Sequence, residues 1–376
     1  MKVMTVVGTR PEIIRLARVI KRLDDTEGIE HVLVHTGQNY DYSLNQVFFD
    51  DLALRAPDHY LQVDTSSLGT VLGGVMTGIE RVLLEEGPDA MLVLGDTNSC
   101  IATVMAKRMG VPTYHMEAGN RCFDENVPEE TNRRLVDHVA DFNLAYTEHA
   151  RRNLLAEGLH PRRVVVTGSP MREVLEAFRE QIEASDAVAR LGLVPGEYFL
   201  VSAHREENVD LPERLAQLLT CLVAVRDRFG RRIIVSTHPR TQKRLQALNT
   251  GLDLAGIDFM EPFGFHDYNK LQLAAGCVLS DSGTISEESS ILGFPAVTLR
   301  DSIERPEALD SGSIIMTGLD VEDVVRAVGI AVADGPIESS HPLGYEIGDT
   351  SNRVVRFIVS TAGRHHHWAG IRKGSR

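Results

Sequence analysis

The sequence has few cysteines and no long apolar stretch. Only four of its 376 residues are cysteine, and none falls in a C-x-x-C or zinc-ligand spacing, so we predict reduced thiols and no metal site. No stretch approaches the ~18 apolar residues that a membrane-spanning helix needs. The start of the chain also lacks the apolar core and small-residue cleavage site of a signal peptide. We therefore expect a cytoplasmic protein without membrane contact.

Positive charge is also scarce. Lysine and arginine number 39 against 53 aspartate and glutamate residues, which gives a net charge of −14. A protein that binds nucleic acid needs a basic face for the phosphate backbone, so no nucleic-acid partner is expected. A few arginines and helix N-termini can still bind an anionic small molecule locally. The composition therefore leaves a small anionic ligand open.

The glycine fingerprint of dinucleotide-binding proteins is missing. The first predicted strand runs into Gly8-Thr9-Arg10-Pro11-Glu12 instead of G-x-G-x-x-G, which disfavours a nicotinamide cofactor. Arg10 would stand at a helix N-terminus, where the helix dipole and free backbone N–H groups favour a phosphate. An exposed arginine in a surface ion pair fits the same position equally well. Both readings of Arg10 remain open.

The chain does contain twelve short apolar or β-branched stretches, each followed by a polar turn and a helical pattern. This alternation predicts an α/β fold with parallel sheets and right-handed crossovers. With six strands in each half, we expect two Rossmann-like, doubly wound domains that face each other across a cleft. The strands are predicted at 3–7, 31–35, 90–94, 113–116, 143–146, 164–167, 198–202, 232–236, 258–260, 277–279, 296–299 and 314–316.

A charged helical stretch that ends in Leu193-Val194-Pro195-Gly196 marks the boundary between the halves. The last helical pattern, at 351–360, has no strand after it. The residues 364–368 are expected to form a frayed surface terminus, with loose metal binding as the alternative. The predicted divisions are an N-terminal domain at 1–170, a connecting helix and linker at 171–196, a C-terminal domain at 197–348, and a helix and tail at 349–376.

Acidic side chains stand at the predicted strand ends of the first half, where α/β folds place their chemistry. Asp96 and Glu117 each follow a strand, and Glu129 and Glu130 stand in the first turn of a helix. Asp96 has an ordinary interpretation as an N-cap, and Glu129 and Glu130 have one as complements to a helix dipole. Acids on three neighbouring turns nevertheless indicate a site with competing carboxylates.

The second half also ends its strands in polar groups. Ser282-Gly283-Thr284 opens a helix, and such a start can hold phosphate oxygens, while Glu288 can accept hydrogen bonds from two ribose hydroxyls. His204 and His238 each end a strand beside an arginine. A lone histidine is more often structural, but two at adjacent strand ends favour contact with a ligand.

These residues belong to a set of motifs that together resemble the non-hydrolysing UDP-N-acetylglucosamine 2-epimerase family. Each motif is weak alone, but seven in order and at matching spacing, over nearly the whole chain, are specific. The motifs are Gly8-Thr9-Arg10-Pro11-Glu12, Gly95-Asp96-Thr97, His115-Met116-Glu117-Ala118-Gly119, Pro128-Glu129-Glu130-Thr131-Asn132-Arg133, His204-Arg205, Asp281-Ser282-Gly283 with Glu287-Glu288, and Glu304-Arg305-Pro306-Glu307-Ala308.

The resemblance implies a GT-B-like fold, usually dimeric, that holds UDP mainly in its second domain and needs no metal or redox cofactor. It also implies roles for twelve residues. The catalytic group would be Asp96, Glu117 and Glu129 with His204 close by; the substrate would be bound by Arg10 at the diphosphate, Tyr268 near uracil, Ser282 and Gly283 at a phosphate, Glu288 at the ribose, and Arg15, His238 and Arg305.

Some positions depart from the commonest members of the family. Arg15 replaces a lysine, and the stretch 120–124, Glu206 and residues 284–286 also differ. These variants resemble the branch that makes UDP-N-acetyl-L-fucosamine from UDP-2-acetamido-2,6-dideoxy-β-L-talose for surface polysaccharide synthesis. The interconversion of UDP-N-acetylglucosamine and UDP-N-acetylmannosamine is the alternative.

The reaction explains why such residues are needed. The C2 proton of the sugar is not α to a carbonyl, so loss of UDP from C1 must come first to make that proton acidic. Fixed cations then stabilise the leaving diphosphate, and differently placed carboxyl groups remove and return the proton on opposite faces. A GT-B glycosyltransferase would need an acceptor as well, and a non-catalytic UDP-sugar sensor would have no use for three acids.

Overall fold

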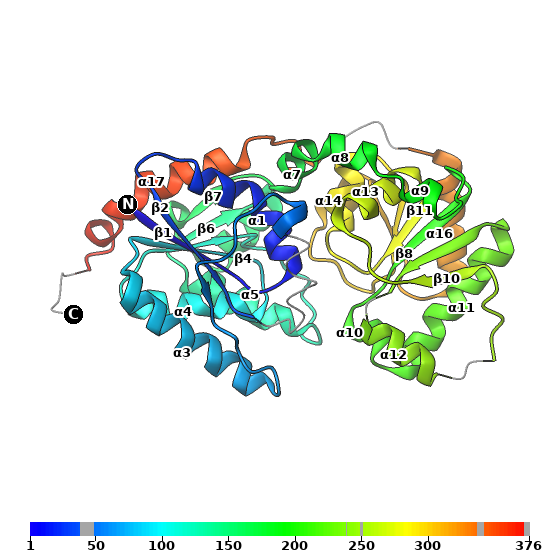
Figure 1. The fold of residues 1–376 in the computed structure, drawn as a ribbon, viewed down its shortest axis with the longest axis horizontal. Coiled ribbons are helices and arrows are strands. Elements are labelled where there is room, and N and C mark those ends of the chain that lie inside the picture. Colours follow the sequence, from blue (N-terminus) through cyan, green and yellow to red (C-terminus); the bar gives the residue numbers. More distant parts are fainter. Residues whose placement is uncertain (38–48, 238, 249–250, 337–341, 372–376) are drawn as a thin grey trace. The chain divides into compact units, whose positions relative to one another are not determined.

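The computed structural model of the chain describes residues 1–371 apart from 38–48, 238, 249–250 and 337–341 (Figure 1). The chain forms two compact units. Unit 1 contains Met1–Glu176 and Leu343–Arg376, and unit 2 contains Ala177–Pro342. Unit 2 is therefore one continuous stretch inserted into unit 1, and the segment 171–196 is divided between the two.

Unit 1 is built on a seven-stranded parallel sheet in the order β3-β2-β1-β4-β5-β6-β7. Its strands are near-continuous apolar runs because helices cover both faces, as parallel sheets require. The short strand β3 was not predicted, since two residues carry no periodic pattern. The strands are β1 Lys2–Val7, β2 Glu30–His35, β3 His59–Tyr60, β4 Ala90–Leu94, β5 Thr113–Met116, β6 Phe142–Ala145 and β7 Val164–Val166.

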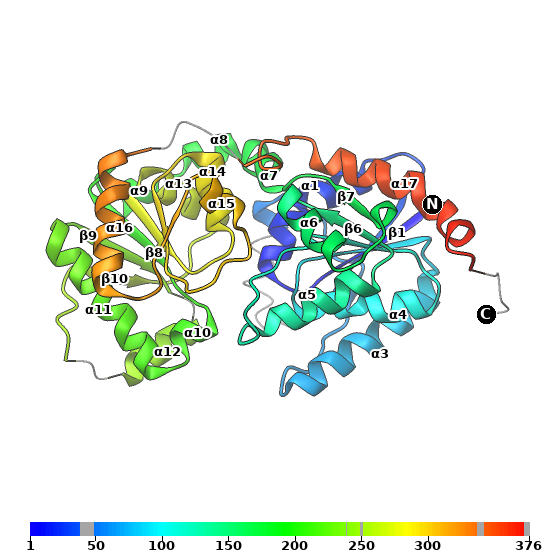
Figure 2. The ribbon, with the colours of Figure 1, turned by 180° about the vertical axis from the view of Figure 1, so that it is seen from behind.

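Figures 1 and 2 both place α1 and α17 over one face of this sheet and α3, α4 and α5 over the other. Beneath α3 and α4 the strands contribute Met4, Val6, Met91 and Val93 to one apolar core. The helices of unit 1 are α1 Arg10–Asp24, α3 Leu68–Glu86, η1 Asn98–Ile101, α4 Ala102–Arg108, α5 Pro128–Val139, α6 Glu148–Ala156, η2 Pro161–Arg163, α7 Met171–Ala177 and α17 Thr350–Trp368.

Unit 2 has a six-stranded parallel sheet in the order β10-β9-β8-β11-β12-β13. Side chains alternate between its two faces: Phe199 and Val201 join the core under α11 and α16, while Tyr198 and Leu200 join the core under α9 and α13. The strands are β8 Tyr198–Ser202, β9 Arg232–Ser236, β10 Ile257–Met260, β11 Cys277–Ser280, β12 Ala296–Thr298 and β13 Ile315–Met316. The helices are α8 Arg179–Ala184, α9 Ala187–Arg190, α10 Glu206–Val209, α11 Pro212–Phe229, α12 Pro239–Ala247, α13 Phe265–Ala274, α14 Ile285–Leu292, α15 Glu307–Asp310 and α16 Val321–Asp334.

All twelve predicted strands are confirmed, each to within one residue at either end. The expectation of a frayed tail at 364–368 was wrong. Helix α17 continues to Trp368 because its last turns bind other elements of unit 1: His365 Nε2 lies 3.0 Å from Asp141 Oδ1, and the ring of His366 is hydrogen-bonded to the Gly110 carbonyl oxygen.

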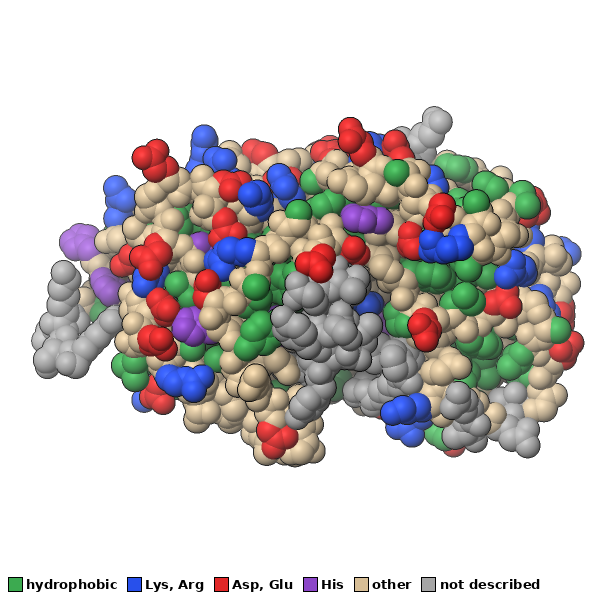
Figure 3. Space-filling view, in the orientation of Figure 1, with side chains coloured by type: hydrophobic (Ala, Val, Ile, Leu, Met, Phe, Trp, Pro, Cys, Tyr) green, Lys and Arg blue, Asp and Glu red, His purple; other side chains and the backbone are tan. Residues whose placement is uncertain are grey.

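The four cysteines are free and buried. Of the helices that the structure describes, none is both long enough and apolar enough to cross a bilayer. On the face drawn in Figure 3, acidic and basic side chains of the described residues are interspersed instead of gathered by sign.

Candidate active site

The carboxyl ends of β1, β4 and β5 are neighbours in unit 1, because these strands are consecutive in the sheet. The turns that follow them carry Arg10, Asp96 and Glu117. Three of the predicted site residues are thus brought to one edge of one sheet, which is where open α/β folds bind ligands.

Glu117 is held by a buried arginine. Nη1 of Arg15, from α1, donates to Oε2 of Glu117, and Nδ2 of Asn120 lies 3.5 Å from its other carboxylate oxygen. The backbone of Glu117 has a φ of +64°, a left-handed conformation that is strained for a side chain of this size. Such strain persists where the surroundings fix it, and it is typical of functional sites.

Asp96 is held by a second buried arginine. Nη2 of Arg133 donates to Oδ2 of Asp96, and its Nη1 donates to Oε2 of Glu130 at 2.6 Å. Burial on its own would raise the pKa of Glu130, but the charge of Arg133 and the N–H of Cys122 hold it below its usual value. Arg133 therefore joins Asp96 to the first turn of α5, where Glu129 lies half-buried beside Glu130.

Glu12 is a residue of this edge that the sequence interpretation missed. Its carboxylate accepts hydrogen bonds from the backbone N–H groups of Gly8 and Thr9 at 2.7 Å, from Thr97 Oγ1 at 2.9 Å, and from Ser99 Oγ. Burial raises the pKa of Glu12 against the opposing effect of these bonds. Glu12 ties the turn that carries Arg10 to the turn that carries Asp96.

Glu12 uses the N–H groups of Gly8 and Thr9, the two residues directly before α1. Binding of a phosphate by Arg10 at this helix start stays a prediction. A glutamate three residues after Thr9 is the sequence signature of a capping box, and that signature could have revealed the role of Glu12.

A buried network supports the two turns that carry Asp96 and Glu117. The ring nitrogens of His115 lie 2.8 Å from Asp137 Oδ1 and 2.7 Å from the Gly95 carbonyl oxygen. The other oxygen of Asp137 accepts from Arg121 Nη1 at 2.7 Å and from the Gly119 N–H at 3.1 Å. Because buried charges are costly unless paired, this network fixes one arrangement of the turns.

Gly119 is required by close packing. Its φ is +87°, and a Cβ added there would lie 2.2 Å from the carbonyl oxygen of Ala150. No other residue fits this position, so the chain that leaves Glu117 passes directly against α6.

In unit 2, the buried carboxylate of Asp281 joins the turns after β8 and β11. It accepts from the backbone N–H groups of His204 and Arg205 and from Asn208 Nδ2, each at 3.1 Å. His204 and Ser282, both predicted site residues, are brought together by this carboxylate. The His204 side chain itself is about half exposed, with Nδ1 3.5 Å from Asp281.

Two guanidinium groups flank Gly283 at the start of α14. Nη1 of Arg305 donates to the Gly283 carbonyl oxygen and lies 3.3 Å from Glu287, and Nη2 of Arg205 lies 3.2 Å from Glu304. A Cβ on Gly283 would lie 3.0 Å from Arg305 Nη1. Arginines beside a glycine at a helix N-terminus form a suitable site for a phosphate.

Glu288 and Tyr268 belong to the neighbouring helices α14 and α13. Oε2 of Glu288 accepts a hydrogen bond from Gln272 Nε2 of α13 at 2.6 Å, which fixes the direction of the carboxylate. Tyr268 is half-buried and packs against the apolar core below α13. His238, which was also predicted to contact the substrate, lies outside the described residues.

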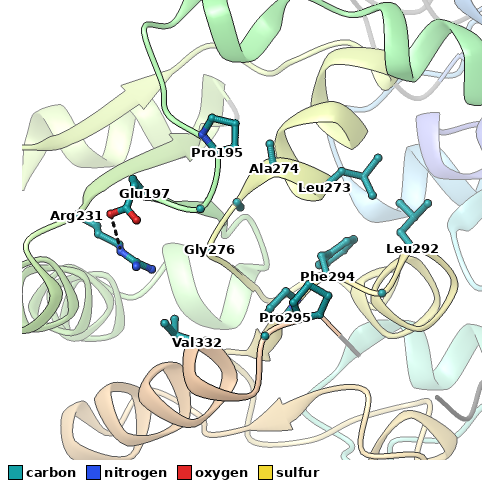
Figure 4. Close-up of a pocket in the computed structure, with 15 residues that line it drawn as sticks. Pro195, Glu197, Arg231, Leu273, Ala274, Gly276, Leu292, Phe294, Pro295 and Val332 are labelled. Atoms are coloured by element: carbon teal, nitrogen blue, oxygen red, sulfur yellow. Dashed lines mark ion pairs between the residues drawn. The ribbon is translucent and has the colours of Figure 1, made fainter. Parts of the chain in front are cut away.

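A pocket of about 520 Å³ lies at the opposite, amino edge of the sheet of unit 2. Its walls are residues that precede β8, β9, β11 and β12, and they are mainly apolar, as Leu273, Phe294 and Pro295 show in Figure 4. The charged pair in it, Arg231 and Glu197, is joined at 3.4 Å. None of the predicted site residues lines this pocket, and the candidate site stays at the carboxyl edges.

The chain is similar to known UDP-sugar 2-epimerases. A family profile described as UDP-N-acetylglucosamine 2-epimerase matches residues 21–359. The solved structure of a UDP-N-acetylglucosamine 2-epimerase from Rickettsia bellii is 44% identical, with a TM-score of 0.92, over 99% of this chain and 100% of that one. The solved structure of the Methanocaldococcus jannaschii UDP-GlcNAc 2-epimerase in complex with UDP-GlcNAc and UDP is 35% identical, with a TM-score of 0.88, over 96% of this chain and 100% of that one.

A relative with another substrate is also similar. The UDP-2,3-diacetamido-2,3-dideoxy-D-glucuronate 2-epimerase of Pseudomonas aeruginosa is 31% identical over 96% of this chain and 99% of its own length. The likeness to the solved structures confirms the prediction of a GT-B-like fold with two parallel α/β domains.

Proposed function

The chain belongs to the UDP-N-acetylglucosamine 2-epimerase family, and we propose that it inverts C2 of a UDP-2-acetamido sugar by eliminating and re-adding UDP. It is an isomerase that acts on a UDP-sugar. The observation that carries the proposed mechanism is the pair of carboxylates, Asp96 and Glu117, each held by a buried arginine at one sheet edge.

The first step breaks the bond between C1 and the diphosphate oxygen, and both electrons leave with UDP. The sugar then has oxocarbenium character, which makes the C2 proton acidic, and a carboxylate of unit 1 removes it to give a 2-acetamidoglycal. Return of a proton to C2 on the opposite face, followed by attack of UDP at C1, gives the epimer. The steps balance without a redox partner.

Unit 1 supplies the groups for proton transfer. Glu117, Asp96 and Glu129 are the proposed acids and bases, because removal and return on opposite faces requires at least two carboxyl groups in different places. The arginine partners of Glu117 and Asp96 fix the direction of each carboxylate in advance of the reaction. Arg10 is the proposed cation for the diphosphate at this edge.

Unit 2 supplies the groups that hold UDP. Ser282 and Gly283 at the start of α14, with Arg305 beside them, form the proposed diphosphate site. Glu288 is the proposed acceptor for the ribose hydroxyls, since its direction is set by Gln272, and Tyr268 on α13 is the proposed neighbour of uracil. His204 stands next to the diphosphate site through Asp281.

We infer that the sugar is UDP-2-acetamido-2,6-dideoxy-β-L-talose, which would give UDP-N-acetyl-L-fucosamine. The support comes from the departures at Arg15 and at 120–124, which lie in or beside the unit 1 site. UDP-N-acetylglucosamine is the second candidate, and the names of the similar enzymes from Rickettsia bellii and Methanocaldococcus jannaschii favour it.

The test is to incubate the protein in D₂O with each UDP-sugar alone and to follow C2 by NMR. We expect the product to be the C2 epimer with deuterium at C2. We also expect one of the two UDP-sugars to be converted at a much higher rate than the other. Product without deuterium rules out the elimination mechanism. Turnover only after addition of a second sugar would assign a glycosyltransferase, and binding without turnover would assign a sensor.

We also propose that the protein acts as a cytoplasmic homodimer. Its free, buried cysteines are consistent with a reducing compartment, and dimers are what the family resemblance implies. Light scattering on the purified protein tests the assembly, and a monomer at micromolar concentration contradicts it.

A further inference from the structure

Phe123 combines two unfavourable features. Its side chain is 71% exposed, the highest value among the described phenylalanine and tryptophan residues. Its backbone has a φ of +56°, which is rare for a bulky side chain. Only four described residues other than glycine have a positive φ, and two of them, Glu117 and Phe123, lie in one short stretch.

The exposed ring does not result from a loose loop, because its neighbours are firmly held. Arg121 is fully buried and donates to both carboxylate oxygens of Glu157 at 2.7 Å and to Asp137. The N–H of Cys122 donates to Glu130 at 3.3 Å. On the other side, Asp124 accepts from the N–H of Asn126 at 3.0 Å. The loop therefore presents the ring of Phe123 to solvent in a fixed place.

Along the chain, Phe123 lies between the proposed catalytic groups. The loop starts at Glu117, whose carboxylate is approached by Asn120, and it ends at the first turn of α5, which carries Glu129. Cys122, directly before Phe123, contacts Glu130. The ring thus belongs to the short segment that joins two of the three proposed catalytic carboxylates.

We propose that Phe123 is a specificity-determining residue that contacts an apolar C6 methyl group of the sugar. This inference rests on the proposed function and deepens it. A glycine here would remove the strain and the exposed apolar surface together, so the ring is explained if it gains contacts when substrate binds. A phenyl ring packs well against a methyl group, but it cannot replace the hydrogen bonds that a 6-hydroxyl loses on burial.

The test uses two UDP-sugars of the ring configuration that the protein turns over, identical except for a hydroxyl on C6. Wild type should prefer the 6-deoxy sugar by about ten-fold or more in kcat/KM. Phe123→Gly removes the ring, and glycine can still adopt the backbone conformation of this position. We expect it to bring the ratio close to one, chiefly by a loss on the 6-deoxy sugar, without a fall in Tm.

Leu84→Ala is the matched control, because Leu84 is 72% exposed and lies on α3; its ratio should equal that of wild type. Phe123→Leu, which keeps an apolar side chain, should retain most of the preference. An unchanged ratio in Phe123→Gly overturns the inference while the proposed function stands. An unchanged ratio with a loss of self-association would assign the ring to a protein interface instead. If wild type turns over neither sugar, the proposed function fails and this inference fails with it.

Discussion

Arg15 of α1 and Glu117 at the end of β5 form an ion pair in which both side chains are 8% exposed. Arg15 was predicted to bind the substrate. In the structure its Nη1 is bound to the carboxylate proposed to move the C2 proton. The charge of Arg15 therefore supports Glu117 in the free protein.

Removal of one partner of this pair should be strongly destabilising. Arg15→Met leaves the carboxylate of Glu117 buried without its cation, and we expect a loss of about 3–5 kcal/mol in the free energy of unfolding. The double variant Arg15→Met/Glu117→Gln should recover most of that loss, because neither charge remains. Urea unfolding measures both. Lys21→Ala, at an exposed i,i+4 pair with Asp25, is the control and should change stability by less than about 1 kcal/mol. Equal losses in the single and double variants would contradict the pairing argument.

Loss of a proposed catalytic carboxyl group should reduce the turnover of the protein that remains folded, beyond any loss of stability. We expect Asp96→Asn, Glu117→Gln and Glu129→Gln each to lower kcat by about 10²–10⁴-fold. Glu148→Gln, in the exposed first turn of α6, should keep the wild-type rate. The measurement is the initial rate of epimerisation, with circular dichroism to confirm folding. If all three variants keep the wild-type rate, the assignment of these carboxyl groups to proton transfer is wrong.

Glu12 offers a test that separates hydrogen bonding from charge. In Glu12→Gln the remaining oxygen can accept from the N–H groups of Gly8 and Thr9, and the new NH₂ group can donate to the hydroxyls of Thr97 and Ser99, since a hydroxyl also accepts. Glu12→Ala leaves these buried donors unpaired. We expect Ala to cost about 1–3 kcal/mol more than Gln in thermal or urea unfolding. If Gln is as damaging as Ala, the negative charge of Glu12 and not its hydrogen bonds holds the two turns.

Asp141 should make stability depend on pH in the acid range. Burial on its own would raise its pKa, but His365 and Lys107 lower it from 3.8 to about 2. A carboxyl group with a folded-state pKa below its unfolded value stabilises the fold above the unfolded pKa, and this contribution, about 2 kcal/mol, is lost as pH falls from about 4 to 2.

Urea unfolding at several pH values between 2 and 5 measures this dependence. His365→Gln and Lys107→Met should each flatten the slope, because each removes a cation that favours the ionised form of Asp141. Lys21→Met, whose ion pair is with Asp25, should leave the slope unchanged. A wild-type slope in both test variants would show that other carboxyl groups dominate acid unfolding.

The strands and the residues at their ends could be predicted because the information is local. Buried parallel strands are apolar runs, and Asp96, Glu117 and Ser282 are recognisable as polar residues that directly follow such runs. The partners of these residues could not be predicted in the same way. Arg15 is 102 positions from Glu117 in the sequence, and Arg133 is 37 positions from Asp96. These partners come together only when the helices pack against the sheet with its strands in their final order.

Other differences have separate causes. The strand β3 is too short to show a periodic pattern. The expectation of a frayed end at 364–368 did not consider that a histidine there can bind a distant aspartate. Glu12 was counted as part of a motif, but its role depends on Thr97 and Ser99, which approach it only once β1 and β4 are paired. The strained φ of Phe123 leaves no mark in the sequence at all.

The return of α17 to unit 1 has a consequence for the newborn chain. Unit 2 is one uninterrupted stretch, so it can fold as soon as it has left the ribosome. Unit 1 lacks α17 until the segment that follows unit 2 has been made, and only then can the hydroxyl of Tyr114 bind that of Thr361, which lies 2.7 Å away in the fold. The half that begins first during translation is completed last.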